Sequence, residues 1–455
     1  MEGDNIEDLS LSPKKGRGEK HVSFPPDEEI VSGFNENKDS LKNDGCRSLL
    51  DVILAYEQSC AKHQVEPNQK LLDQLKQVSS VKGRAGCLDL KGERLDYRSC
   101  ESLEEVLKSV QYDFINLQET ELEENGASSL LDMILYYESA AHLNISSNTK
   151  MGISGWQALS RLLRQSGCLW RLDACNVPVV EYPVQALSKA LLTSRLTVLN
   201  LENTCLSGRP LFTLVGSLRK NTMLQDLCLA NNQLNSYQDS VQLGDLLQSS
   251  RSLRSLDLRS NLIADAGLEE IREALNARKS GLRSLLLCNN QITHSGMTSL
   301  ANILPCLNSL ETLDLGQNPL QNPGVHGLKE ALMMNRSILH LGLADTQISC
   351  EGAVALAEFI AESRQIQRLD IRRNCVLVGG LLAFSLALGI NCSLIRLDLD
   401  QNSEQEKDEF LIETQKKVLS RISDLCVANE KAANAGTLLP PTPVTVPLPH
   451  PHPDC

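Results

Sequence analysis

Aromatic residues are scarce in this sequence of 455 residues, at 4% of the chain, whereas hydrophobic residues make up 42%. Aliphatic side chains must therefore form most of its core. No stretch approaches the roughly 20 apolar residues that a membrane span requires, and the N-terminal sequence MEGDNIEDLSLSPKK lacks the apolar segment of a signal peptide. We therefore expect a cytoplasmic or nuclear protein that is not secreted and does not bind membranes.

Motifs for catalysis and metal binding are also missing. The fifteen cysteines occur singly, without a CxxC pair or a Cys/His cluster at zinc-ligand spacing, so we expect reduced thiols and no metal. The eight histidines offer no nucleophile and base pair, and no glycine-rich phosphate-binding loop is present. The formal net charge of −13 disfavours nucleic acid as a partner. The sequence predicts a protein that binds other proteins, with neither enzymatic activity nor a cofactor.

What the sequence does contain is a leucine repeat. LRSLDLRSNLI (253–263) and LRSLLLCNNQI (282–292) are near copies 29 residues apart. The first aliphatic residue of each LxL core recurs in steps of about 28 residues, at Leu88, Ile115, Leu143, Leu172, Leu199, Leu227, Leu256, Leu285, Leu313, Leu341, Leu369 and Leu397. Twelve units of the leucine-rich-repeat pattern LxxLxLxxN are therefore predicted.

Each unit has a short alternating segment followed by helical spacing, as in GLEEIREAL (267–275), which predicts one strand and one helix per repeat. The polar turn position is expected to bond to backbone groups; it holds Asn148, Asn232, Asn261, Asn290, Asn318, Asn374 and Asn402, with Thr120, Thr204 and Thr346 in other units. The period and the full helices resemble the ribonuclease-inhibitor type of leucine-rich repeat. That resemblance implies an α/β solenoid, a horseshoe with parallel strands inside and helices outside.

The expected organisation has five parts: a disordered tail at 1–44, an N-terminal helical cap at 45–80, twelve repeats at 81–403, a C-terminal capping helix at 404–436, and a proline-rich tail at 437–455. Amphipathic spacing predicts the cap helices. They span 48–60, 69–78 and 409–426, and the last of them is expected to turn Phe410, Val418, Ile422 and Leu425 toward the repeats.

The residue between the two aliphatics of each LxL core should point away from the core, so stacked repeats form a ladder on the concave face. The ladder is rich in acid and includes the candidate binding residues Asp173, Asp257, Asp314, Asp370 and Asp398. Arg368, Arg372 and Arg396 are expected to pair with the last two across neighbouring strands. The acidic ladder is either a solvated surface or the docking site of a second, basic protein.

A short motif, KHVSF, interrupts the polar N-terminal tail. In an extended chain Val22 and Phe24 point to one face, and the following prolines oppose a helix. A basic residue, Lys20, precedes these two apolar anchors, which suits addition to an exposed sheet edge with pockets for alternate side chains. This looks like the docking motif through which many regulatory subunits bind the catalytic subunit of protein phosphatase 1.

The arrangement of tail and repeats resembles the leucine-rich-repeat regulatory subunits of protein phosphatase 1. The residues that carry the resemblance are KHVSFPPDEEIVSG, CLDLKGERLDY (87–97), YYESAAHLNIS (136–146) and CEGAVALAEFIAES (350–363). The resemblance implies that the chain binds the catalytic subunit through Lys20, Val22 and Phe24 and inhibits or redirects it.

Two serines in the tail are candidate regulatory phosphorylation sites. Phosphate on Ser23 would put negative charge between the two apolar anchors and oppose docking, and Ser12 precedes a proline as in proline-directed kinase sites. Two other functions stay open. One is a scaffold or blocker that holds a basic protein on the concave face, and the other is a GTPase-activating solenoid like a regulator of nuclear transport.

Overall fold

The computed structural model describes residues 48–78, 83–235, 237–277, 281–400 and 408–436. The predicted tails at 1–44 and 437–455 lie outside the described residues, as does Asn402. The cysteines that the structure describes are all free thiols. None of the described helices is long and apolar enough to cross a membrane.

Two helices, α1 (Leu49–His63) and α2 (Gln69–Gln77), precede the repeats, close to the predicted ranges. Ser48 begins α1 with a capping box, because its hydroxyl accepts from the Asp51 amide while the Asp51 carboxylate accepts from the Ser48 amide. The buried face of α1 packs against helices α3 (Tyr97–Ser102) and α4 (Glu104–Ser109) of the first repeat. These helices therefore cover the leucine layer at the start of the array.

The repeats form one parallel sheet in which the strands follow one another in chain order. The strands are β1 (Arg84–Asp89), β2 (Gln111–Asn116), β3 (Ala140–Asn144), β4 (Arg171–Asp173), β5 (Val198–Asn200), β6 (Asp226–Cys228), β7 (Ser255–Asp257), β8 (Ser284–Leu286), β9 (Thr312–Asp314), β10 (His340–Gly342), β11 (Arg368–Asp370) and β12 (Arg396–Asp398). All of them pair in register at the LxL positions, as with Leu256 and Leu285.

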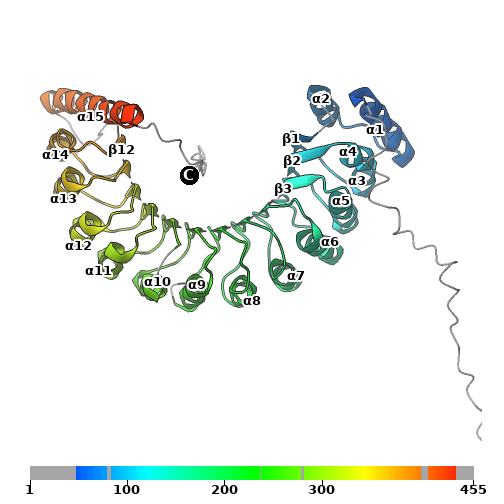
Figure 1. Ribbon diagram of the computed structural model, residues 1–455, viewed down its shortest axis with the longest axis horizontal. Helices are drawn as coiled ribbons and strands as arrows, with labels where there is room; N and C mark the ends of the chain where they lie inside the picture. The colour runs from blue at the N-terminus through cyan, green and yellow to red at the C-terminus, as the bar shows by residue number, and fades with distance from the viewer. Residues whose placement is uncertain (1–47, 79–82, 236, 278–280, 401–407, 437–455) are drawn as a thin grey trace, which may run out of the picture. The chain divides into compact units, whose positions relative to one another are not determined.

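A helical segment separates each strand from the next. After α3 and α4 these are α5 (Glu124–Tyr136), α6 (Gly152–Gln165), α7 (Tyr182–Leu191), α8 (Arg209–Leu218), α9 (Gln238–Ser249), α10 (Asp265–Ala277), α11 (His294–Ile303) with the 3-10 turn η2 (Leu304–Cys306), α12 (Gln321–Met334), α13 (Cys350–Glu362) and α14 (Val378–Leu388). Within the repeat array the strands line the inner, concave side and the helices the outer side (Figure 1). The predicted leucine-rich-repeat solenoid is confirmed.

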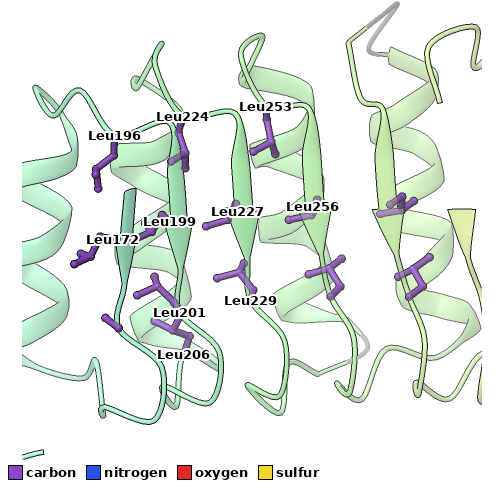
Figure 2. Close-up of a cluster of buried hydrophobic side chains, with 14 of the residues drawn as sticks. Leu172, Leu196, Leu199, Leu201, Leu206, Leu224, Leu227, Leu229, Leu253 and Leu256 are labelled. Carbon is purple, nitrogen blue, oxygen red and sulfur yellow. The ribbon is translucent and has the colours of Figure 1, made fainter. Parts of the chain in front are cut away.

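Leucine rows hold the repeats together. The leucines of the LxxLxL segments in the middle of the array, such as Leu224, Leu227 and Leu229, are buried between the sheet and the helices. Figure 2 shows them stacked beside the same positions of the neighbouring repeats. One strand and one helix cannot cover such a row alone, so each repeat takes its stability from its neighbours.

The polar turn position forms a second ladder, as predicted. The Nδ2 group of Asn232 donates to the carbonyls of Leu201 and Ala230, and its Oδ1 accepts from the amides of Thr204 and Leu206 in the preceding repeat. Asn148, Asn261, Asn290, Asn318 and Asn374 repeat this pattern. The asparagines therefore satisfy backbone groups that the tight turns leave inside the fold.

The C-terminal helix α15 (Glu409–Gly436) packs against α14 and β12. Val418 and Ile422 are buried and Leu425 is partly buried against the core, which agrees with the predicted face. The prediction for Phe410 is wrong, because this side chain is 73% exposed. Phe410 lies in the first turn of the helix, before the part of α15 that is buried.

Candidate functional site

The predicted docking residues of the tail, Lys20, Val22 and Phe24, lie outside the described residues, and so do Ser12 and Ser23. The described candidates are the aspartates of the concave face, by which we mean the side of the sheet turned away from the helices. Strand register brings Asp370 and Asp398 side by side. It separates the others, because Asp173, Asp257 and Asp314 each have neighbours of another type in the adjacent strands.

Asp173 is the least exposed of these carboxylates. Its Oδ2 lies 2.5 Å from His142 Nε2 and 3.1 Å from Arg171 Nε, and only 7% of the residue is exposed. Burial favours its neutral form, but the hydrogen bond from His142 and the charge of Arg171 outweigh burial and lower the pKa of Asp173. This carboxylate is therefore already bound by a histidine and an arginine of its own chain.

Three further candidates are paired in the same way. Asp257 binds Arg259, with 2.7 Å between Oδ2 and Nη2, and Asp370 binds Arg372, with 2.6 Å between the same atoms. Asp398 binds Arg368 from the neighbouring strand and Arg396 from its own strand, each at 2.8 Å. The predicted pairing across strands is therefore found for Arg368. Arg396 pairs with Asp398 within β12, where residues two apart share a face, and Arg372 reaches back to Asp370 from the turn after β11.

Asp314 differs from the other four. Its carboxylate accepts a hydrogen bond from the Gly316 amide at 3.0 Å, and among the described residues no cationic side chain lies within ion-pair distance of it. Burial raises the pKa of Asp314. The neighbouring rung is Gly342, where a Cβ would lie 2.3 Å from the Asp314 Oδ1 atom, so glycine makes room for the carboxylate. Of the five predicted residues, Asp314 is therefore the one whose carboxylate is not neutralised by a cation of its own chain within ion-pair distance, among the described residues.

The contrast between Asp173 and Asp314 predicts that two matched substitutions differ in their effect on the free energy of unfolding. Asp173→Asn should lower the free energy of unfolding at pH 7 by about 1 to 3 kcal/mol, because it removes a carboxylate that accepts charged hydrogen bonds. Asp314→Asn should leave it unchanged or raise it, because a raised folded-state pKa means that the native state loses stability as the pH rises through that pKa. Urea unfolding of both variants at pH 7 checks this. Equal destabilisation by the two would contradict the assignment.

An aromatic cluster on the concave face was not predicted from the sequence. The ring centroids of Phe114 and His142 are 4.1 Å apart and their planes 17° apart, and the Trp170 ring centroid lies 6.1 Å from that of His142. Phe114 and His142 occupy the strand position two residues before the acidic ladder. The sequence signal for Phe114 and His142 is that two neighbouring repeats both carry an aromatic ring two residues before the ladder position. We call Phe114, His142 and Trp170 the aromatic cluster.

The described side chains include residue types that can bind a metal, and thiols whose reactivity depends on their pKa. Within the parts of the chain that the structure describes, no group of three or more His, Cys, Asp or Glu side chains could hold a metal ion. Burial raises the pKa of the thiols of Cys100 and Cys288 to about 12, which keeps both groups protonated at neutral pH.

Comparison with known proteins agrees with this geometry. A family model described as "Leucine Rich repeat" matches residues 249–271 and 306–328. Protein phosphatase 1 regulatory subunit 37 of Bos taurus is 47% identical over 293 residues, which are 64% of this chain and 42% of that protein. The Danio rerio protein of the same name is 50% identical over 295 residues, covering 65% of this chain and 32% of that protein.

A more distant relative carries a similar name. The protein phosphatase 1 regulatory subunit 37 homolog of Caenorhabditis elegans is 35% identical over 296 residues, covering 62% of this chain and 31% of that protein. The chain thus spans less than half of the length of the curated relatives that it matches. Over the matched part, this chain is a leucine-rich-repeat protein homologous to protein phosphatase 1 regulatory subunit 37.

Proposed function

We propose that this chain is a regulatory subunit of protein phosphatase 1 that binds the catalytic subunit through Lys20, Val22 and Phe24. The observation that carries the proposal is its identity of 47 to 50% with vertebrate proteins named as regulatory subunits of this phosphatase. The KHVSF motif adds support of a different kind, since it has the residue types of a known docking motif.

Physical chemistry explains how five residues can dock. An extended segment adds to a sheet edge through its backbone, and alternate side chains enter pockets on one side. Val22 and Phe24 would fill these pockets, and Lys20 would meet an acidic rim. His21 and Ser23 would face outward, where phosphorylation of Ser23 would weaken docking.

In this proposal the chain contributes no reaction of its own. The repeat array inhibits or redirects the phosphatase by covering part of its surface or by holding a second protein. The net charge of −13 favours protein partners over nucleic acid or membranes. The proposed place of action is the cytoplasm or the nucleus.

One observation favours a second candidate function, a scaffold that holds a basic protein on its concave face. Asp314 and Asp226 both lie on that face, and among the described residues neither has a cation within ion-pair distance. Burial raises the pKa of both carboxyl groups, so a partner's lysine or arginine would relieve an unfavourable charge.

Deleting residues 1–44 separates the two functions. If the tail is the dock, the shortened chain should lose binding to the phosphatase catalytic subunit while its circular dichroism spectrum keeps the signal of the folded repeats. Full binding by the shortened chain would contradict tail docking and favour the concave face.

A further inference from the structure

The aromatic cluster comes from three consecutive repeats and combines an exposed tryptophan, Trp170, with the half-buried rings of Phe114 and His142. Phe114 lies on β2, His142 on β3, and Trp170 directly precedes β4. The chain has two tryptophans, of which Trp156 on α6 is buried and Trp170 is 44% exposed. In a chain with so few aromatic residues, this is a concentration of the side chains that dominate protein interfaces.

Hydrogen bonds hold the cluster in place. His142 is fixed by Asp173 at 2.5 Å, and Arg171 binds the same carboxylate. The backbone of Trp170 is anchored on both sides, since its amide donates to Ala141 and its carbonyl accepts from Thr197. A surface that is already ordered loses little conformational entropy when a partner binds, so its contacts count almost fully toward affinity.

The charges around the cluster are already satisfied. Arg171 and His142 share the carboxylate of Asp173, so covering these groups leaves no unpaired ion at the interface. This matches the anatomy of interface centres, which combine aromatic side chains with few free charges. The side chain of Trp170 would insert into the partner as an anchor, and the stacked rings of Phe114 and His142 would lie beside it in the interface.

The position of the cluster in the repeat array suggests which protein it contacts. It lies on β2 and β3 and at the residue before β4, within about 15 Å of the first strand at the usual strand spacing. Between Phe24 and Ser48 there are 23 residues. A chain of that length spans at most about 80 Å when it is fully extended. The number of residues between the motif and Ser48 therefore permits a protein bound at the motif to contact these strands as well.

We propose that the aromatic cluster is a second contact surface for the catalytic subunit of protein phosphatase 1, which binds the motif and the cluster together. The inference rests on the proposed function. Two linked contacts bind more tightly than either alone, typically by a factor of about 100 or more. This would also bring the phosphatase against the repeats, as steric inhibition or redirection requires.

The test compares four ligands in calorimetric titrations of the phosphatase catalytic subunit: the full chain, a synthetic peptide of residues 12–30, and the full-chain variants Trp170→Ala and Phe212→Ala. Phe212 is the matched control, because it is an aromatic residue, 63% exposed, on helix α8. We expect the full chain to bind at least about 100-fold more tightly than the peptide. Trp170→Ala should fall to the affinity of the peptide, and Phe212→Ala should bind like the unchanged chain.

The outcomes separate this inference from the function on which it rests. Peptide and full chain binding equally would overturn the inference and keep the tail as the dock. Tighter binding of the full chain that survives Trp170→Ala would also overturn it, because the second contact would lie elsewhere. If neither peptide nor full chain binds, the proposed function itself fails. Thermal unfolding of both variants shows whether a lost affinity reflects a lost fold.

Discussion

Replacing Val22 and Phe24 with alanine should weaken binding of the protein phosphatase 1 catalytic subunit by at least about 100-fold. Burying one large apolar side chain contributes about 1.5 to 3 kcal/mol, so losing most of two such contacts removes about 3 to 6 kcal/mol. The motif would keep only its backbone hydrogen bonds and the contact of Lys20. Calorimetric titration of the double variant and of the unchanged chain measures the difference.

The matched control is His21→Ala with Ser23→Ala, a double variant of the same two-residue spacing. In an extended segment these side chains point to the opposite face from the two anchors. Binding of this control should stay within about threefold of the unchanged chain, because surface contacts of this kind contribute little. A similar loss in both double variants would show that the alternation assumed for the motif is wrong.

The second large effect concerns stability. Asn232→Ala should lower the free energy of unfolding by about 3 kcal/mol, because it leaves buried backbone groups of two repeats without partners. The asparagine side chain bonds to the carbonyls of Leu201 and Ala230 and to the amides of Thr204 and Leu206. Water cannot replace these bonds, since Asn232 is only 1% exposed. Urea unfolding followed by circular dichroism measures the loss.

Asn308→Ala is the control for that substitution. Asn308 is exposed, and its side chain forms no hydrogen bond with the described residues, so its removal should change the unfolding free energy by less than about 0.5 kcal/mol. A loss below about 1 kcal/mol for Asn232→Ala would mean that the turn ladder is less important for stability than its geometry indicates.

The repeat fold could be predicted in detail because its information is local and recurs. Each LxL core marks a strand, and a spacing of 27 to 29 residues leaves room for one helix. Buried asparagine at the turn was also predictable, since few side chains both donate and accept in so small a space. In contrast, Asn335 and Asn391, which bond in the same way to carbonyls at the helix ends, gave no such signal.

Other features depend on backbone conformation and side-chain length, which the repeat pattern does not specify. The residue before the turn position has a positive φ in repeat after repeat, as at Asn203, Asn231, Ser260 and Gln317. These positions differ in residue type, so the sequence pattern hides a shared left-handed turn. Phe410 was misassigned because helical periodicity gives the face of a residue but not where along the helix the buried part begins.

The candidate site was predicted only in part. The ladder of concave aspartates follows from strand alternation, but its charge is reduced by Arg171, Arg259 and Arg372, which neutralise aspartates two residues away. Pairing at that spacing needs side chains of the right length in the right rotamer. The aromatic cluster arises from register, which brings Phe114 beside His142 although they are 28 residues apart.

The central claim is that this chain binds the catalytic subunit of protein phosphatase 1 through its N-terminal motif. Calorimetric titration of that subunit with the full chain tests it most directly, with phosphatase activity measured on the same samples. We expect a one-to-one complex, changed activity toward a protein substrate, and loss of binding in the Val22→Ala, Phe24→Ala variant. Absence of binding by the full chain would contradict docking through the motif, and so would unchanged binding by the double variant.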